Sequence, residues 1–247
     1  MKNHFTILIT SYNVESWAEK NISSALKQNY HNYDILLIDD ASTDKTFKIV
    51  ERCCEETSSY CSNIKTIKNS FNKGKMENVY SAMDVIKDGS IIIILDGDDW
   101  LAHENVLSVL NNVYDENVWM TSGSYVENIS KRIVNPKIDD DYWEGVMRHK
   151  TWETSHLSTF RKELFLKIKC KHLMKKTGEF FSTTSDQAMM WPILEMSGKK
   201  HFRVINEVLY VYNRSNPLSD DRAFRRDQLE TERVIRNMKP YEPLETL

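Results

Sequence analysis

The chain has 247 residues, of which 40% are hydrophobic, so it is long enough to bury a sizeable core in one domain. Its 33 basic and 36 acidic residues give a net charge of −3. Because a protein that binds nucleic acid broadly is usually basic, this balance argues against such a partner.

No segment has the roughly 20 apolar residues that cross a bilayer, and the N-terminus lacks the apolar core of a signal peptide. We therefore expect a soluble, cytoplasmic protein, with residence at a membrane surface and self-association left open. The four cysteines form no Cys-x-x-Cys pair, so free thiols are favoured over a zinc site: Cys53, Cys54, Cys61 and Cys170.

Residues 1–100 alternate between apolar runs and amphipathic stretches. The pattern predicts strands at 4–10, 33–40, 63–69 and 90–97, and helices at 14–28, 42–56 and 72–89. Continuous apolar strands separated by helices are typical of a parallel sheet covered on both faces. The predicted fold class is α/β, a Rossmann-like three-layer α/β/α sandwich with a mostly parallel central sheet.

The second half is less regular. Its pattern predicts strands at 118–127 and 204–213 and a charged helix at 222–238. The stretch 150–168 is predicted to begin irregular and become helical. Residues 185–198 are predicted as a helix with a kink or early turn near Pro192. No shift in composition marks a linker, so we expect residues 1–247 to form a single domain with two lobes, 1–100 and 101–247.

Polar residues follow three of the predicted strands, as Thr10-Ser11, Asp39-Asp40 and Asp96-Gly97-Asp98-Asp99. Right-handed crossovers bring the carboxyl ends of parallel strands to one edge of a sheet, where ligands bind in folds of this kind. We therefore expect these residues to line one ligand crevice.

The cluster Asp96, Asp98 and Asp99 has two readings. A solvated turn with a helix cap explains one carboxylate well, but three close carboxylates repel one another. A hard divalent cation, Mn²⁺ or Mg²⁺, removes that repulsion, and we favour it. For Asp39-Asp40, a helix cap and a carboxylate that accepts from a ligand N–H are equally good explanations.

Four stretches in order, ITSYN, LLIDDASTDKT, NKGKMEN and IIILDGDDW, together resemble the motifs of glycosyltransferase family 2, whose fold is the GT-A type. The resemblance implies a metal-dependent, inverting transfer of one sugar from a nucleotide-diphosphate sugar, often a UDP-sugar. The acceptor would be a hydroxyl group of a glycan, lipid or protein, and the metal Mn²⁺ or Mg²⁺.

The same resemblance implies roles for individual residues. The predicted nucleotide-sugar contacts are Thr10, Ser11, Tyr12, Asn13, Asp39 or Asp40, Asp96 and Gly97. Asp98 would be the metal ligand. Lys75 falls near the donor pocket, although a solvated lysine on a helix face is an equally good interpretation. Residues 1–100 would bind the donor, and residues 101–247 would supply acceptor contacts and the catalytic base.

An inverting transfer needs a carboxylate that takes the proton of the acceptor hydroxyl. Asp186 in Ser185-Asp186-Gln187 matches the position where the family usually has a Glu-Asp pair, although the Glu is replaced by Ser185. We predict Asp186 as the catalytic base; a helix N-cap is the alternative.

Three further residues are candidate acceptor or diphosphate contacts. Trp152 and His156 lie in a stretch reminiscent of soluble family members, with core packing and a hydrogen-bonded histidine as their favoured alternatives. Arg214 falls where many members have a loop that closes on the diphosphate, and a surface salt bridge explains it equally well.

Two rival functions stay open. A sugar nucleotidyltransferase usually has a Gly-rich, basic loop after its first strand, whereas residues 9–17 contain neither Gly nor Lys. A non-catalytic protein that binds sugar nucleotides or glycans would fit the replacement at Ser185. The absence of the Q-x-x-R-W motif of processive members implies addition of a single sugar.

Overall fold

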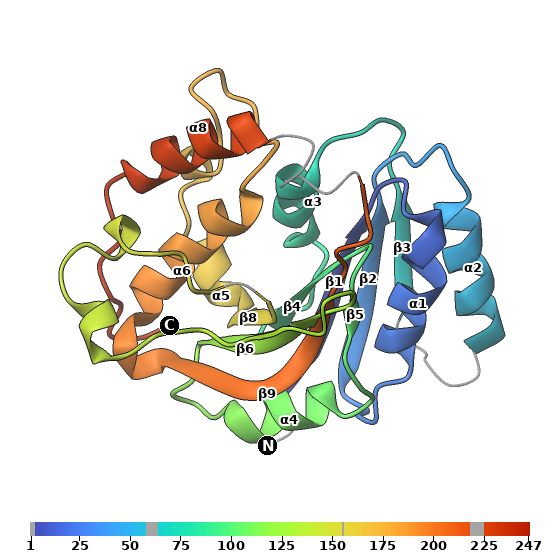
Figure 1. The fold of residues 1–247 in the computed structure, drawn as a ribbon, viewed down its shortest axis with the longest axis horizontal. Helices are drawn as coiled ribbons and strands as arrows, with labels where there is room; N and C mark the ends of the chain where they lie inside the picture. The colour runs from blue at the N-terminus through green and yellow to red at the C-terminus, as the bar shows by residue number, and fades with distance from the viewer. Residues whose placement is uncertain (1–2, 58–63, 155, 218–224) are drawn as a thin grey trace.

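The structure is a computed structural model and describes residues 3–57, 64–154, 156–217 and 225–247. Strands and helices alternate through the first half of the chain (Figure 1): β1 (Phe5–Ser11), α1 (Glu15–Leu26), β2 (Tyr33–Asp39), α2 (Thr46–Thr57), β3 (Ile64–Lys68), α3 (Lys75–Ala82) and β4 (Ile91–Asp96). These seven elements confirm the order predicted from the apolar runs.

The second half continues with β5 (Trp100–Leu101), α4 (Val106–Val113), β6 (Met120–Glu127), β7 (Ile133–Val134), β8 (Ser158–Arg161), α5 (Lys162–Leu166), α6 (Ser185–His201), β9 (Phe202–Tyr212) and α8 (Arg225–Arg236). All nine strands belong to one sheet, in the order β3-β2-β1-β4-β8-β6-β9-β5, with β7 paired to β6. One sheet therefore runs through both predicted lobes.

The sheet is parallel where the βα repeats build it and mixed elsewhere. β1, β2, β3 and β4 pair in parallel, as do β6 and β9, whereas β8 is antiparallel to both β4 and β6. The long-range β6–β9 pairing fastens the C-terminal part of the chain beside the first four strands (Figure 1).

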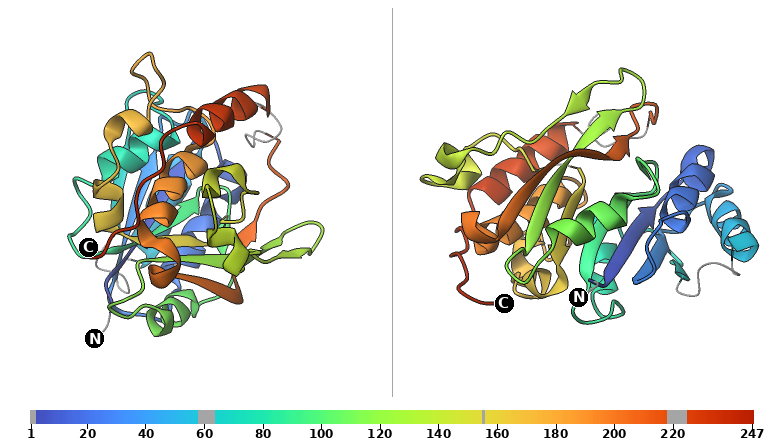
Figure 2. Two further views of the ribbon diagram at one scale, coloured as in Figure 1. Left: turned by 90° about the vertical axis from the view of Figure 1, so that its left-hand side faces the viewer. Right: turned by 90° about the horizontal axis from the view of Figure 1, so that it is seen from below.

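Helices cover both faces of the sheet, as the apolar strands predict. Alternate β1 side chains face opposite layers: Leu8 packs with residues of α3, α5 and α6, and Ile7 and Ile9 pack with residues of α1, α2 and α4. The two views of Figure 2 show the sheet between these helical layers. The predicted three-layer α/β/α arrangement is confirmed.

Some predicted boundaries were wrong. The stretch 150–168, predicted as irregular and then helical, contains β8, whose residues pair with β4 and β6. The helix predicted over 72–89 ends at Ala82, and β5, α4 and β7 were not predicted. The helix containing Pro192 passes through it and has its non-helical residue at Gly198, with φ 56°.

The predictions for the cysteines and for the C-terminal helix can be compared with the structure only in part. Cys53, Cys54 and Cys170 are free cysteines, and Cys61 lies outside the described residues, as do residues 222–224 of the predicted C-terminal helix. Among the described residues, no helix combines the length and the apolar character needed to span a bilayer.

A buried ion pair ties the C-terminal segment to α6. Arg148 contacts both carboxylate oxygens of Glu195, at 2.6 and 2.7 Å, and neither side chain is more than 2% exposed. Arg148 also donates to the carbonyl of Ile235 in α8, and Glu195 accepts from the backbone N–H of Tyr241. This network fixes α8 over α6.

Candidate active site

The polar residues that follow β1, β2 and β4 meet at one edge of the sheet. Ser11 is in register with Asp39, and Thr10 with Asp96. The N–H of Gly97 donates to the carbonyl of Thr10 at 3.0 Å. A Cβ at Gly97 would lie 2.5 Å from Oγ of Ser11, so only glycine fits where the two turns cross.

The loops after β1 and β2 are joined by hydrogen bonds. Asn13, at φ 51°, donates its N–H to Oγ of Ser42 at 2.9 Å and accepts from the N–H of Thr43 at 2.8 Å. These bonds make Asn13 part of the scaffold of the crevice. The preceding Tyr12 is 47% exposed, so its ring is available to a ligand.

Asp39 and Asp40 are adjacent in the sequence but differ in their hydrogen bonds. Asp39 is fully buried; its Oδ2 accepts from the N–H of Ser42 at 3.1 Å, and its Oδ1 has no hydrogen-bond partner. Asp40 accepts from the amide of Asn69 and from the N–H groups of Lys73 and Gly74, at 2.8–2.9 Å. Asp39 thus has an acceptor to spare, whereas Asp40 holds the 69–74 loop.

The hydrogen bonds that Asp40 accepts also change its pKa. Burial raises the pKa of Asp40, but the hydrogen bonds it accepts outweigh burial and hold the pKa below its ordinary value. A carboxylate so fully used by its own loop has little capacity left for a ligand. The free Oδ1 of Asp39 makes it the better acceptor for a ligand N–H.

Lys75, at the start of α3, forms an ion pair with Oδ1 of Asp96. Both side chains are about one quarter exposed, at 26% and 24%. Burial raises the pKa of Asp96, but the charge of Lys75 and then that of His156 lower it more, so the net pKa is below the ordinary value. The structure therefore places the Lys75 side chain against Asp96 at this edge of the sheet.

The Asp99 carboxylate accepts hydrogen bonds from β9 and from the loop after it. Its Oδ2 accepts from the Tyr210 hydroxyl at 2.5 Å and its Oδ1 from the N–H of Asn213 at 2.7 Å. Burial, followed by the charges of Asp98 and Asp96, raises the pKa of Asp99 well above its ordinary value. A carboxyl under that electrostatic load is stabilised by a nearby cation.

His156 comes from the segment before β8 and lies among aromatic rings. Its imidazole stacks on Tyr210 with the ring centroids 4.7 Å apart and on Tyr212 at 5.2 Å. Burial lowers the pKa of His156, with Lys75 adding to the effect and the charges of Asp96 and Asp186 opposing it. The neutral imidazole that results is the form that binds metals.

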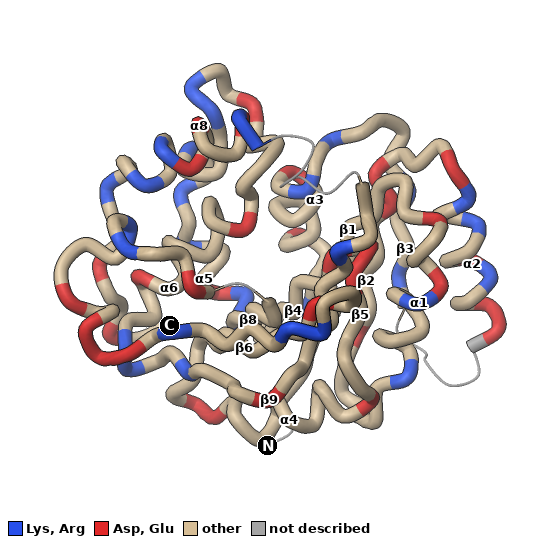
Figure 3. Tube along the Cα trace, viewed as in Figure 1, with Lys and Arg blue, Asp and Glu red and all other residues tan. Residues whose placement is uncertain are grey.

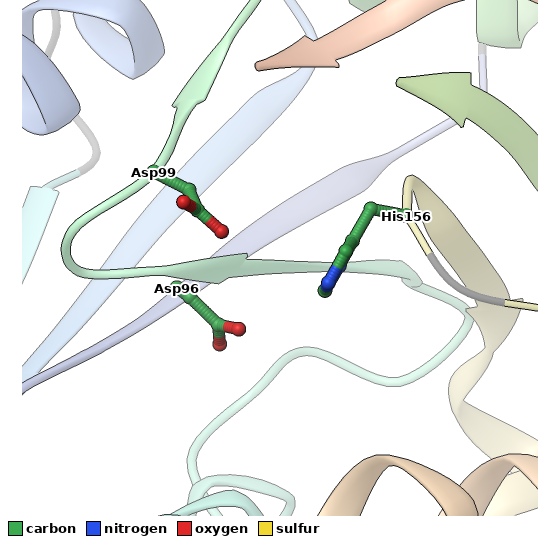
Figure 4. Close-up of side chains that lie close together, drawn as sticks. All are labelled: Asp96, Asp99 and His156. Atoms are coloured by element: carbon green, nitrogen blue, oxygen red, sulfur yellow. The ribbon is translucent and has the colours of Figure 1, made fainter. Parts of the chain in front are cut away.

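Asp96, Asp99 and His156 converge on one point. Each offers one ligand atom, and these atoms all lie within 4.8 Å of one another (Figure 4). Two carboxylates and an imidazole suit Mn²⁺, which accepts oxygen and nitrogen ligands. The family resemblance implied Asp98 as the metal ligand, whereas the geometric cluster comprises Asp96, Asp99 and a histidine.

Asp98 itself is bound by the loop after β9. Its Oδ2 accepts from the side-chain amide of Asn216 at 2.8 Å. Burial raises the pKa of Asp98; the hydrogen bond from Asn216 opposes this and the charge of Asp96 adds to it. The loop that contains Asn213 and Asn216 therefore contacts both Asp98 and Asp99.

Asp186 lies in the first turn of α6 and is partly exposed. The residue at the N-cap position of α6 is Thr184, with φ 58°, and no side chain caps the helix there. The capping interpretation of Asp186 is therefore wrong. The charge of Asp186 opposes the effect of burial on the pKa of His156, so the two side chains are close enough to interact electrostatically.

Trp152 and Arg214 occupy different surroundings. Trp152 packs against the core, edge-to-face with Trp191 at 4.9 Å, in line with the packing alternative. The guanidinium of Arg214 lies 5.5 Å from the centre of the Tyr212 ring, and its backbone N–H donates to Asn128. Arg214 thus belongs to the loop that follows β9.

Sequence reasoning missed Tyr210 and Asn216 as residues of the site, and it placed His156 among the acceptor or diphosphate contacts and not in the metal cluster. Tyr210 and Asn216 lie 111 and 118 positions from the aspartates they contact. The local signal was weak, because Tyr210 belongs to an apolar strand and Asn216 to the asparagine-rich segment Asn213-Arg214-Ser215-Asn216. The pairing of β9 with β5 and β6 brings this part of the chain to the aspartates after β4.

Solved structures with the same architecture are glycosyltransferases. The chain superposes on TarS of Staphylococcus aureus in complex with UDP-GlcNAc, with a TM-score of 0.68 and 16% identity over 94% of this chain and 65% of that one. It superposes on the mannosyltransferase PcManGT of Pyrobaculum calidifontis, in complex with GDP-Man and Mn²⁺, with a TM-score of 0.63 and 19% identity over 98% and 66%. The fold is that of the GT-A class.

Sequence comparison gives the family. The family model described as "Glycosyl transferase family 2" matches residues 6–177, and the chain therefore belongs to glycosyltransferase family 2. Two Escherichia coli relatives are UDP-Glc:α-D-GlcNAc-diphosphoundecaprenol β-1,3-glucosyltransferases. WfgD is 33% identical over 49% of this chain and 45% of its own length, and WfaP is 30% identical over the same shares. The chain thus matches about half the length of these curated relatives.

Proposed function

We propose that this protein is a metal-dependent, inverting glycosyltransferase that moves one sugar from a UDP-sugar to an acceptor hydroxyl. The observation that carries the proposal is the convergence of Asp96, Asp99 and His156, with ligand atoms within 4.8 Å of one another, at the carboxyl edge of a GT-A sheet. Burial and the neighbouring carboxylates raise the pKa of Asp99, and a bound cation would relieve that electrostatic load.

The nucleotide would bind on the β1–β2 side of the crevice. Oδ1 of Asp39, which has no partner, would accept from the N3–H of uracil, and the exposed ring of Tyr12 would cover the base. WfgD is named for UDP-Glc, and the TarS structure is a complex with UDP-GlcNAc. These features favour a UDP-sugar over other donors.

The acidic cluster fits Mn²⁺ or Mg²⁺ by the chemistry of its donor atoms. Asp96, Asp99 and His156 would hold the ion, with Asp98 contributing from the same turn. When bound, the ion would supply positive charge that stabilises the diphosphate as it leaves. Lys75, already paired with Asp96, would add a second positive charge on the donor side.

Asp186 would be the base. It would accept the proton of the acceptor hydroxyl while that oxygen forms a bond to the anomeric carbon and the bond to the diphosphate breaks. Its carboxylate has no hydrogen-bond partner among the described residues, and its first-turn position in α6 keeps it on the acceptor side. Ser185, which replaces the usual Glu, is buried and leaves Asp186 as the acidic residue of this turn.

The acceptor is an open part of the proposal. WfgD and WfaP are named for a lipid diphosphate acceptor, and TarS for poly(ribitol phosphate). Both named acceptors carry phosphate groups, although the chemistry of the transfer needs only a hydroxyl. An acceptor panel should therefore include phosphate-bearing and neutral glycans.

The test is a screen for release of nucleoside diphosphate from UDP-, GDP- and TDP-sugars, with Mn²⁺ and with EDTA. We expect release from a UDP-sugar that EDTA abolishes and that Asp98→Asn reduces. With an acceptor present, Asp186→Asn should lower the transfer rate by about 100-fold or more, because general base catalysis is lost. The exposed Asp84→Asn is the matched control and should leave the rate unchanged.

Two outcomes would favour the alternative functions. Metal-dependent UDP binding in calorimetry without turnover on any acceptor would favour a non-catalytic sugar-nucleotide-binding protein. Formation of a nucleotide sugar from a nucleoside triphosphate and a sugar phosphate would identify a nucleotidyltransferase.

A further inference from the structure

A groove of about 750 Å³ lies away from the donor crevice, between the segment after α5 and the end of α8. One wall consists of Lys171, Met174, Lys175, Lys176 and Gly178, and the other of Arg233, Val234, Asn237 and Met238. We call this the basic groove. None of the residues proposed to bind the donor lines it.

The basic groove is positively charged. Four of its nine lining residues are Lys or Arg, and none is acidic. The segment 167–176 adds to the charge, since it has five lysines in ten residues and no acid. Figure 3 shows basic positions along this part of the chain and along α8.

Two of the three acidic residues of α8 are paired within the helix, since Glu230 accepts from Arg226 at 3.2 Å and Glu232 from Arg236 at 2.7 Å. The third, Asp227, lies in the first turn, whereas Arg233 at the other end of the helix lines the groove. His172 lies within the same segment and responds to the surplus of positive charge. Burial lowers its pKa first, and the charges of Lys171, Arg148 and Lys169 lower it further.

Apolar side chains accompany the cations. Val234, in the wall of the groove, is 45% exposed. Two exposed apolar residues lie outside the lining: Leu229 of α8 is 47% exposed, and Leu166 at the end of α5 is 57% exposed. Met174 and Met238 line the groove itself. A surface that mixes exposed apolar side chains with lysine and arginine is typical of proteins that lie at the interface of an anionic membrane.

We propose that the basic groove docks this protein on an anionic phospholipid surface, with the lysines contacting lipid phosphates and the apolar side chains entering the headgroup region. A nucleic acid fits less well, because the lining offers no aromatic ring for stacking and the whole chain carries a net charge of −3. An acidic protein would not call for an exposed apolar residue, Val234, in the wall of the groove.

The position of α8 gives the docking a consequence for the active site. The hydroxyl of Thr184, the N-cap residue of α6, donates to the carbonyl of Gln228 in α8 at 3.3 Å. Arg233 follows Gln228 by five residues, or about 7.5 Å along the helix. A membrane held at the basic groove would therefore lie near the start of α6, where the proposed base Asp186 is.

The experiment is flotation of the whole chain with vesicles of phosphatidylcholine alone and with vesicles that contain about 30% phosphatidylglycerol, a content at which juxtamembrane lysines bind. We expect binding to the anionic vesicles only, and release by salt because exposed charges are screened. Lys171→Glu/Lys176→Glu should lower the partition constant by about tenfold or more. Val234→Asp should also lower it, because the apolar contact is lost.

The matched control is Lys27→Glu/Lys48→Glu, which makes the same change in net charge at exposed positions on the α1 and α2 side. An equal loss of binding in this control would overturn the proposal in favour of a general charge effect. Failure of the wild type to prefer anionic vesicles would overturn it, as would tighter binding to single-stranded RNA than to vesicles. Thermal unfolding and donor hydrolysis without vesicles should be unchanged in the groove variants, which separates a docking defect from a failure of the proposed activity.

Discussion

The hydroxyl of Tyr210 lies 2.5 Å from Oδ2 of Asp99 and donates a hydrogen bond to it. The hydroxyl oxygen of Tyr210 also accepts from the backbone N–H of Asp96, at 3.4 Å. One side chain of β9 therefore contacts both aspartates of the proposed metal cluster. Since ligands are oriented by the groups that hydrogen-bond to them, Tyr210 is a positioning residue for the cluster.

Tyr210→Phe should weaken metal binding as well as the fold. Loss of a donor to a buried carboxyl should lower the free energy of unfolding by about 1–3 kcal/mol, and loss of ligand orientation should lower Mn²⁺ affinity by about tenfold. Thermal unfolding and calorimetry with Mn²⁺ and UDP measure the two effects. Tyr30→Phe is the control, because it removes bonds to Asn3 and Asn111 at the other end of the sheet and should reduce stability alone. Equal Mn²⁺ affinity in the wild type and Tyr210→Phe would rule out the positioning role.

Gly97→Ala tests the close crossing of the turns after β1 and β4. The new Cβ would lie 2.5 Å from Oγ and 2.9 Å from Cα of Ser11, so the backbone must move. We expect a loss of about 1–3 kcal/mol in stability, as for other overpacked sites, together with weaker UDP binding. Gly123→Ala is a milder control, since its Cβ would come no closer than 3.4 Å to Leu157. Unchanged UDP affinity in Gly97→Ala would show that the crossing does not shape the donor site.

The sequence predicted the parts of the fold that depend on local pattern. The apolar runs of β1, β2 and β4 identify themselves as buried strands, and parallel pairing then requires their polar ends to meet. β8 escaped prediction because its four residues, Ser158–Arg161, are strand only through pairing with β4 and β6. Short strands of this kind have no pattern of their own, and long-range contacts decide their conformation.

The residues of the candidate site also fall into those that sequence motifs identify and those that only the structure identifies. Asp96, Asp98 and Asp186 lie in recognisable motifs, so residue type and order were enough to single them out. Which of Asp39 and Asp40 has a free acceptor depends on whether the 69–74 loop supplies donors, and no sequence pattern encodes that. His156 was a candidate for the acceptor side, whereas the geometry brings its imidazole to Asp96 and Asp99.

Asp40→Asn should make the protein less stable at neutral pH but not in acid. The folded pKa of Asp40 is below its ordinary value, so its contribution is complete at pH values above that value and is lost as the pH falls through the lowered pKa. We expect the variant to be about 1–3 kcal/mol less stable at pH 7, and the difference to close below about pH 4. Chemical unfolding at several pH values measures this. The exposed Asp84→Asn should show no such dependence, and a pH-independent difference for Asp40→Asn would exclude the charge as its cause.

The buried Arg148–Glu195 pair allows a sharper test of what holds α8 in place. Arg148→Met leaves the carboxylate of Glu195 buried without its partner, which should lower the free energy of unfolding by about 3–5 kcal/mol. Arg148→Met/Glu195→Leu should recover part of the loss, because two packed apolar side chains need no charge partner, although the carbonyl of Ile235 stays unpaired. Arg52→Met breaks the exposed pair with Glu19 and should cost at most about 1 kcal/mol. Urea unfolding of the four proteins gives the comparison, and a double variant less stable than Arg148→Met would mean that Glu195 stabilises the fold without Arg148, through the N–H of Tyr241.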